Sequence, residues 1–162
     1  MQSFKIIKPI HILTPYVRYY WILEDGADVS VSERTLPTGC IQLVFHRGKR
    51  LLLVGKKESQ PQAFICGQCL NFSDVMSAGK IEMITVVFQP YAARAILQLP
   101  LKFFYGELIA VDAIADLELS ILSRKVIEAD DHETCIRLIE QFLIHRLYRF
   151  EGYERSEEHT SE

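Results

Sequence analysis

The stretch Lys80-Ile-Glu-Met-Ile-Thr-Val-Val-Phe88-Gln-Pro90 marks the point at which the chain changes from strands to helices. Its odd-numbered and even-numbered residues occupy opposite faces, which is the alternation of a β-strand. Both faces are apolar near Phe88, so this strand is predicted to be buried on two sides near its end. Pro90 suits the first position of a helix, which predicts that a helix follows at once.

Upstream of this stretch, back to about residue 16, the pattern is that of further strands. Residues 19–23 are aromatic and β-branched, and they end at a turn that contains Gly26. The other predicted strands are residues 33–36, 40–46, 49–54 and 62–66. Arg47-Gly48 separates two of these segments, which predicts a hairpin between residues 40–46 and residues 49–54.

Downstream of Pro90, apolar residues recur with a period of about 3.6 residues, as in helices. A short helix is expected to end near Pro100, and a second is expected over residues 115–128. The last helix is predicted to begin at Asp130, with Glu133 completing an N-terminal cap. Its apolar residues repeat along one face: Cys135, Leu138, Ile139, Phe142, Leu143 and Leu147.

The order of these segments predicts an α+β fold. A β-barrel or sandwich, of which a cupin-like barrel is one form, is expected over about residues 16–89, with helices over about residues 90–149. The chain has 162 residues, so one domain covering residues 1–150 is the simplest organisation. Residues 151–162 are polar and acidic, and we expect a disordered tail or a truncated linker there.

The charge balance argues against direct DNA binding. The net charge is −3 at pH 7, whereas a DNA-binding domain normally carries an excess of Lys and Arg on one face. The sequence contains no run of about 18 apolar residues and no cleavable leader pattern, so a cytoplasmic location without membrane contact is expected. The four cysteines lie in apolar stretches, which predicts reduced thiols.

No pattern typical of a catalytic centre occurs. The five histidines lack the HxH, HxxH or HExxH spacing of metal sites, and no GxSxG, GxGxxG or Walker-type segment is present. Cys66 and Cys69 have the spacing of a redox pair, but Cys66 ends a strand-like segment instead of opening a helix. We therefore expect no enzyme activity, no metal and no cofactor.

Basic residues gather on the last predicted helix. Acidic residues interrupt them, and positive charge near the end of a helix is favourable in itself. We expect a solvated face there, formed by Arg137, His145, Arg146 and Arg149.

Four segments, taken in order, carry a resemblance to a known family. They are Pro15-Tyr-Val-Arg-Tyr-Tyr-Trp-Ile-Leu-Glu24, Leu36-Pro-Thr-Gly-Cys-Ile-Gln-Leu-Val-Phe45, Phe64-Ile-Cys-Gly67 and Ile84-Thr-Val-Val-Phe-Gln-Pro-Tyr-Ala-Ala-Arg-Ala-Ile-Leu97. Together these segments resemble the N-terminal domain of AraC-type transcriptional regulators. The resemblance covers roughly residues 9 to 148. It implies a β-rich sensory domain that is followed, in such regulators, by two helix-turn-helix units that read DNA. The resemblance stops near residue 150, where the DNA-binding half would begin, so we expect an excised or a naturally truncated form, with DNA contacted only through a C-terminal domain absent from this chain.

The expected function is therefore regulatory. The domain is expected to bind a small-molecule effector, to form a homodimer, or both, and so to bias the placement of two DNA-binding units. Strand periodicity suggests a pocket lined by Trp21, Gln42, Val44, His46 and Phe88. Ile136 and Ile144 lie off the main apolar face of the last helix, and we expect them to form a dimer interface.

Two other functions remain open from the sequence. One is a small cupin-like or thiol-based enzyme that uses His46 with Cys66 and Cys69, which a bound metal or a depressed thiol pKa would favour. The other is a dimerisation module with a solid β layer, which an interior without a ligand-sized cavity would favour.

Overall fold

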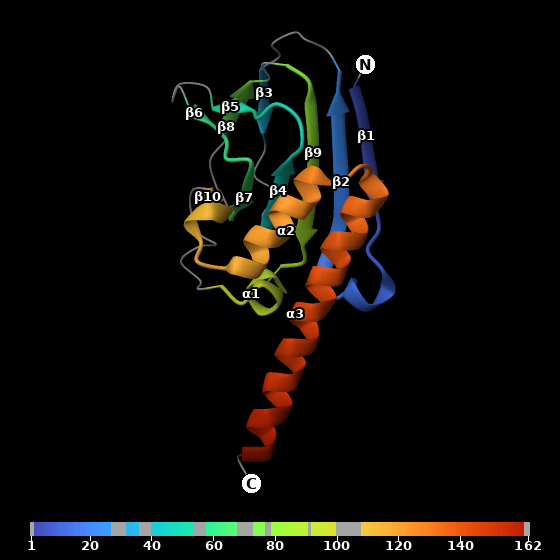
Figure 1. The fold of residues 1–162 in the computed structure, drawn as a ribbon, viewed down its shortest axis with the longest axis vertical. Helices are drawn as coiled ribbons and strands as arrows, with labels where there is room; N and C mark the ends of the chain where they lie inside the picture. Colours follow the sequence, from blue (N-terminus) through green and yellow to red (C-terminus); the bar gives the residue numbers. More distant parts are fainter. Residues whose placement is uncertain are drawn as a thin grey trace.

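A computed structural model describes residues 2–26, 32–35, 40–53, 58–67, 73–76, 79–90, 92–99 and 108–160. Two antiparallel sheets precede the main helices (Figure 1). The larger sheet has six strands, in the order β1 (Gln2–Ile7), β2 (Val17–Asp25), β9 (Ile81–Phe88), β4 (Gln42–His46), β7 (Ala63–Cys66) and β10 (Ile109–Ala110). The smaller sheet has four, in the order β3 (Ser32–Thr35), β8 (Ser73–Met76), β5 (Leu52–Leu53) and β6 (Glu58–Ser59).

Five helical segments accompany the sheets within the described residues. They are the 3-10 turns η1 (His11–Leu13) and η3 (Val111–Ala113), and the helices α1 (Ala92–Leu97), α2 (Leu117–Glu128) and α3 (His132–Thr160). The predicted α+β class, with the β-rich part first and helices after it, is confirmed; the sheets form a sandwich-like arrangement that does not close into a barrel. In the described part of the chain, no helix is both long and apolar enough to cross a membrane.

One face of the larger sheet, here called the helix face, carries the main hydrophobic core. Successive strands contribute buried residues in register, because side chains alternate along each strand. The helix-face residues are Tyr20, Ile22, Leu43, Phe45, Ala63, Ile65, Ile84, Val86 and Phe88. Helices α2 and α3 cross in front of this face (Figure 1) and complete the core with Leu119, Leu122, Val126, Cys135, Ile139, Leu143 and Leu147.

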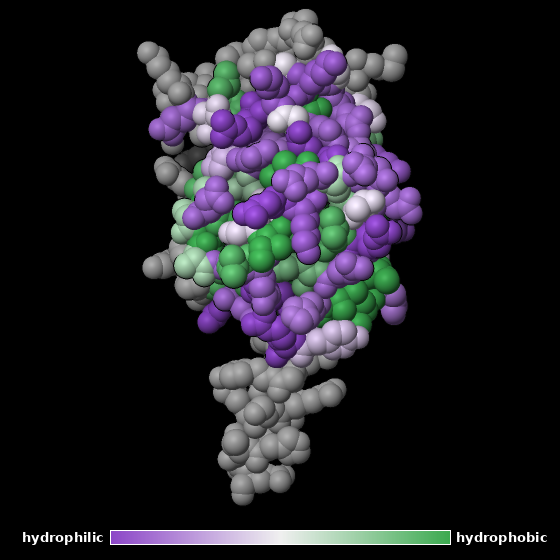
Figure 2. Space-filling model, in the orientation of Figure 1, coloured by the Kyte–Doolittle hydropathy of each residue, from purple (hydrophilic) through white to green (hydrophobic). Residues whose placement is uncertain are grey.

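The opposite face of the larger sheet is here called the far face. Its residues are Trp21, Leu23, Gln42, Val44, His46, Phe64, Cys66, Met83, Thr85 and Val87. Part of this face forms a second apolar cluster, which Leu51 joins from the segment that leads into β5. The surface over the helices is largely hydrophilic, with smaller apolar groups between (Figure 2). Exposed apolar residues there include Leu117, which is 75% exposed at the start of α2.

The predicted hairpin around Arg47-Gly48 is wrong. Strand β4 is paired on both edges, with β9 and β7, so β5 cannot lie beside it and joins the smaller sheet instead. The Arg47-Gly48 backbone runs along the start of β9, where Arg47 N donates to Glu82 O at 2.7 Å and Lys49 N donates to Lys80 O at 2.8 Å. Sequence periodicity identified β4, β5, β7 and β9 but not which of them are neighbours.

The last helix also differs from the prediction at both ends. Asp131, not Asp130, caps α3, because its Oδ1 accepts from Thr134 N at 2.7 Å. The helix continues to Thr160 instead of ending near residue 149, and in Figure 1 its last turns run past the body of the domain. A polar composition does not end a helix, since Glu and Arg are good helix formers. Strand β1 was not predicted, although Phe4 and Ile6 alternate with polar residues there.

Candidate functional site

Four of the five residues predicted to line a pocket lie together on the far face. Trp21 and Val44 are both paired with Thr85, and Gln42 and His46 lie on either side of Val44 along β4. Phe88 does not share this face, because it is an even-numbered residue of β9 and is fully buried on the helix face. In β9, Thr85 lies on the far face beside Trp21 and Val44, whereas Phe88 lies on the helix face, because successive side chains of a strand point to opposite faces.

Two buried polar side chains on the far face each have one atom without a hydrogen-bond partner in the described part of the chain. His46 is fully buried, and its Nε2 lies 2.8 Å from Gln60 Oε1. With Gln60 Oε1 as the acceptor, Nε2 carries the proton and Nδ1 is left as an acceptor, for which the described residues supply no donor. Thr85 is fully buried as well, and its Oγ1 has no partner among the described residues. Such atoms are rare in folded proteins because each lost hydrogen bond is destabilising.

The environment of His46 keeps its imidazole neutral. Burial lowers the pKa of His46 and the charge of Arg50 lowers it further, while the hydrogen bond to Gln60 acts in the opposite direction without reversing the result. The ring of Phe64 lies 5.8 Å away, centroid to centroid. The far face therefore buries a neutral acceptor and a hydroxyl within apolar surroundings.

Arg47, the next residue after His46, joins the larger sheet to the helices. Its Nε lies 2.7 Å from Glu82 Oε1, and its terminal nitrogens donate to the carbonyl oxygens of Val126 and Ala129 at the end of α2. Nη1 also lies 2.9 Å from Cys135 Sγ in α3. Because the Arg47 side chain is only 8% exposed and has partners on three elements, it fixes the junction of α2 and α3 against β9.

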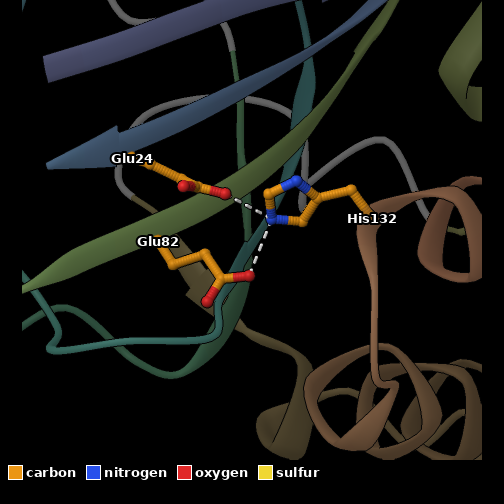
Figure 3. Close-up of side chains that lie close together, drawn as sticks. All are labelled: Glu24, Glu82 and His132. Atoms are coloured by element: carbon orange, nitrogen blue, oxygen red, sulfur yellow. Dashed lines mark hydrogen bonds and ion pairs between the residues drawn. The ribbon is translucent and has the colours of Figure 1, made fainter.

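His132, the first residue of α3, lies between two carboxylates (Figure 3). Its Nε2 is 2.9 Å from Glu24 Oε1 and 2.8 Å from Glu82 Oε1. Glu24 and Glu82 are paired across β2 and β9, so the strand register brings the two carboxylates together. Burial raises the pKa of Glu82, but the hydrogen bonds and charges of Arg47 and His132 lower it by more, so this pKa lies below its usual value.

Further polar contacts hold α3 to the domain. Glu140 Oε2 accepts from the Tyr20 hydroxyl at 3.1 Å and from Ile10 N at 2.8 Å. Burial, followed by the charge of Glu140, raises the pKa of Tyr20, which stays protonated. Arg146 is 4% exposed and donates to Leu97 O, so the prediction that it belongs to a solvated face is wrong. Helical spacing alone did not reveal that this position faces the end of α1.

The predicted dimer residues Ile136 and Ile144 are half-buried. Both pack against the main core of their own chain, next to the fully buried Cys135 and Leu143. The most exposed large apolar residues among those described lie elsewhere, at Leu117, Phe4, Tyr148 and Ile6. Much of the stripe predicted for a partner is therefore covered within the chain.

The three described cysteines, Cys40, Cys66 and Cys135, are buried or half-buried. Cys66 is half-buried. Its predicted redox partner, Cys69, lies outside the described residues. Burial raises the pKa of the Cys135 thiol despite the nearby charge of Arg47. A raised pKa keeps this thiol protonated and a poor nucleophile.

Sequence reasoning missed Arg47, Glu82, Glu24 and His132 as a group. They come from four separate segments of the chain, so no short motif contains them. The one local signal was Glu82, a charged residue in a strand whose other even-numbered residues are apolar.

Residues 5–110 match the model of a family described as a domain of unknown function (DUF6597). The match covers more than half of the chain and includes all or part of every strand in both sheets. No curated protein and no solved structure matches the chain.

Proposed function

The chain belongs to the DUF6597 family, and we propose that it is a regulatory domain that binds a small effector on the far face and couples binding to α3. In this proposal the domain is not an enzyme and acts in the cytoplasm as part of an AraC-type transcription regulator. DNA contact is assigned to a C-terminal unit outside residues 1–162. The coupling is a shift in population between two placements of α3.

The observation that supports effector binding is a pair of buried atoms, His46 Nδ1 and Thr85 Oγ1, for which the described residues supply no hydrogen-bond partner. A ligand with an N–H or O–H group can donate to His46 Nδ1, and the Thr85 hydroxyl can donate to or accept from the same molecule. Trp21, in register with Thr85, supplies an aromatic surface beside them. This combination of an apolar lining with a few polar groups is typical of small-molecule sites.

The adjacency of His46 and Arg47 supports the coupling. A displacement of His46 by a ligand would move the backbone of Arg47, whose guanidinium holds Glu82 and the carbonyl oxygens of Val126 and Ala129. The effect would therefore reach the junction between α2 and α3 within one residue of the ligand. Helix α3 responds as a unit, since polar contacts bind it to the domain at both His132 and Arg146.

Self-association is part of the proposal, because two domains are needed to set the relative positions of two DNA-binding units. Ile136 and Ile144 each keep part of their surface exposed on α3. Light scattering across a concentration series is expected to give the mass of a dimer. A monomer at every concentration would remove self-association and leave effector binding as the whole proposal.

Fluorescence of Trp21 offers a direct test of effector binding, because it is the only tryptophan in the chain and lies on the far face. We would screen sugars, carboxylic acids and aromatic metabolites for a change in Trp21 emission and a raised melting temperature. For a compound that binds, Thr85→Val is expected to weaken affinity about tenfold, the loss of one hydrogen bond.

Thr14→Val is the matched control, since the Thr14 hydroxyl is exposed and donates to His11 O at 2.8 Å, away from the far face. It is expected to leave affinity unchanged. A screen without any binder, or equal affinities for Thr85→Val and Thr14→Val, would contradict effector binding at this face. Hydrogen exchange of the first turn of α3, with and without the compound, then tests the coupling.

A further inference from the structure

The cluster of Glu24, Glu82 and His132 at the start of α3 has the composition of a metal site. The three donor atoms, one from each side chain, lie within 4.8 Å of one another. His132 Nε2 is 2.9 Å from one carboxylate oxygen and 2.8 Å from the other. A metal ion with bonds of about 2.1 Å places adjacent donors about 3.0 Å apart in octahedral and about 3.4 Å apart in tetrahedral geometry, so the two His132–carboxylate separations are close to those of octahedral coordination.

The surroundings orient the donors. Arg47 holds Glu82 Oε1 at 2.7 Å, and its own guanidinium is fixed by the carbonyl oxygens of Val126 and Ala129. Outer groups that hydrogen-bond to a liganding carboxylate commonly set its direction in metal sites. Glu82 Oε1, which Arg47 orients, and Glu24 Oε1 are the carboxylate oxygens next to His132 Nε2, so these atoms face the position of an ion.

The charge balance favours a cation. Two carboxylates and one guanidinium leave a negative charge in the cluster when His132 is neutral, and Glu128, Asp130, Asp131 and Glu133 flank His132 in the sequence. Their combined field attracts positive ions. The Glu24 side chain is 48% exposed and that of His132 is 30% exposed, so an ion can enter from solvent.

We propose that Glu24, Glu82 and His132 bind one divalent first-row transition metal ion, which links β2, β9 and the first turn of α3. One imidazole and two carboxylates suit ions such as Zn²⁺, Co²⁺ and Mn²⁺. The ion takes the position between the imidazole and the carboxylates that a proton on Nε2 otherwise occupies. This proposal stands independently of effector binding on the far face, since the two sites use different residues on opposite faces of the sheet.

Co²⁺ titration of the full chain, followed by absorption spectroscopy and calorimetry, tests the site. The expected result is one Co²⁺ per chain with the weak visible bands of nitrogen and oxygen ligands, without the strong near-ultraviolet band of thiolate ligands. Glu24→Gln and His132→Gln are each expected to weaken Co²⁺ binding by at least about tenfold. The ion should also raise the melting temperature of the unaltered protein and not that of His132→Gln.

His145→Gln is the matched control, because His145 is an exposed histidine on the same helix. It is expected to bind Co²⁺ with unchanged affinity. Glu24→Gln guards against a folding defect in His132→Gln, since Glu24 is half-exposed and circular dichroism can verify both variants. The proposal is overturned by the absence of stoichiometric binding, by unchanged affinity in folded Glu24→Gln, or by a thiolate band that disappears in Cys66→Ser.

Discussion

Arg146 in α3 donates from one terminal nitrogen to both carboxylate oxygens of Asp116, at 2.6 and 2.7 Å. Asp116 also caps α2, where its Oδ1 accepts from Leu119 N at 3.1 Å. The second terminal nitrogen of Arg146 donates to Leu97 O, and its guanidinium lies over the ring of Phe142 at 4.9 Å. One buried cation therefore holds the end of α1, the start of α2 and the middle of α3 together.

Arg146→Met is expected to lower the free energy of unfolding by about 3–5 kcal/mol, because it leaves Asp116 without its buried counter-charge. Urea denaturation provides the measurement. Arg149→Met is the matched control: Arg149 binds Glu118 on the surface, with both side chains about half-exposed, and its loss should change stability by less than about 1 kcal/mol. Equal effects of the two substitutions would show that burial of Arg146 does not matter.

Thr85→Val is expected to raise the free energy of unfolding by about 1 kcal/mol in the absence of any ligand. Valine has nearly the same shape, and it removes a buried hydroxyl that lacks a partner among the described residues. Thermal denaturation gives the comparison, with Thr85→Ser retaining the hydroxyl. A lower stability for Thr85→Val would mean that this hydroxyl already has a hydrogen-bond partner.

Stability should fall as the pH drops below 6.5, in part because of His46. The pKa of His46 in the folded protein lies below the usual histidine value of 6.5, so the unfolded chain binds the proton first. The contribution of His46 is therefore complete above pH 6.5 and is lost as the pH falls through the folded-state pKa. Urea denaturation on both sides of pH 6.5 should show a shallower loss in His46→Gln than in the unaltered protein.

His11→Gln serves as the comparison for this pH dependence, since His11 is exposed. Its pH profile is expected to follow that of the unaltered protein. An identical acid limb in His46→Gln and His11→Gln would contradict the assigned role of His46.

Gly48→Ala is expected to destabilise the fold by about 1–3 kcal/mol. A Cβ at this position would meet the backbone of β9, at 2.7 Å from Lys80 O and 2.9 Å from Glu82 N, so the chain itself must move. Gly26→Ala is the natural control, because a Cβ there meets nothing within 4 Å. Melting temperatures of the two variants should differ clearly, and equal values would mean that the Gly48 segment adjusts freely.

The sequence predicted most of the elements but few of their relationships. Periodicity of two identified β2, β4, β7 and β9, and a period of 3.6 identified α1 and α2, because both patterns are local. Strand neighbours depend on contacts between distant segments, so the hairpin at Arg47-Gly48 was predicted where β4 has β9 and β7 on its two edges. Alternation on a single strand also could not place Phe88 relative to His46 on another.

The partners of the buried and clustered polar side chains were even harder to predict from the sequence than the strand neighbours. The place of His46 at a strand end predicts a pocket residue, and His46 does lie on the far face. Its neighbour Arg47 is assigned by the sequence only to a turn. Arg146 and His132 lie on α3 at positions that periodicity alone assigns to solvent or to a helix end. Their partners Asp116, Glu24 and Glu82 belong to other elements, so only the folded arrangement brings these charges together.

The position of β9 between β2 and β4 has a consequence for synthesis of the chain. As the protein leaves the ribosome, β1 with β2 and β4 with β7 can pair first, but these two groups remain unconnected until residues 81–88 emerge. The unpaired edges of β2 and β4 and the apolar faces of both groups are exposed during that interval. Folding of the larger sheet is therefore a late, non-local step, and slow translation upstream of β9 should increase the demand for chaperones.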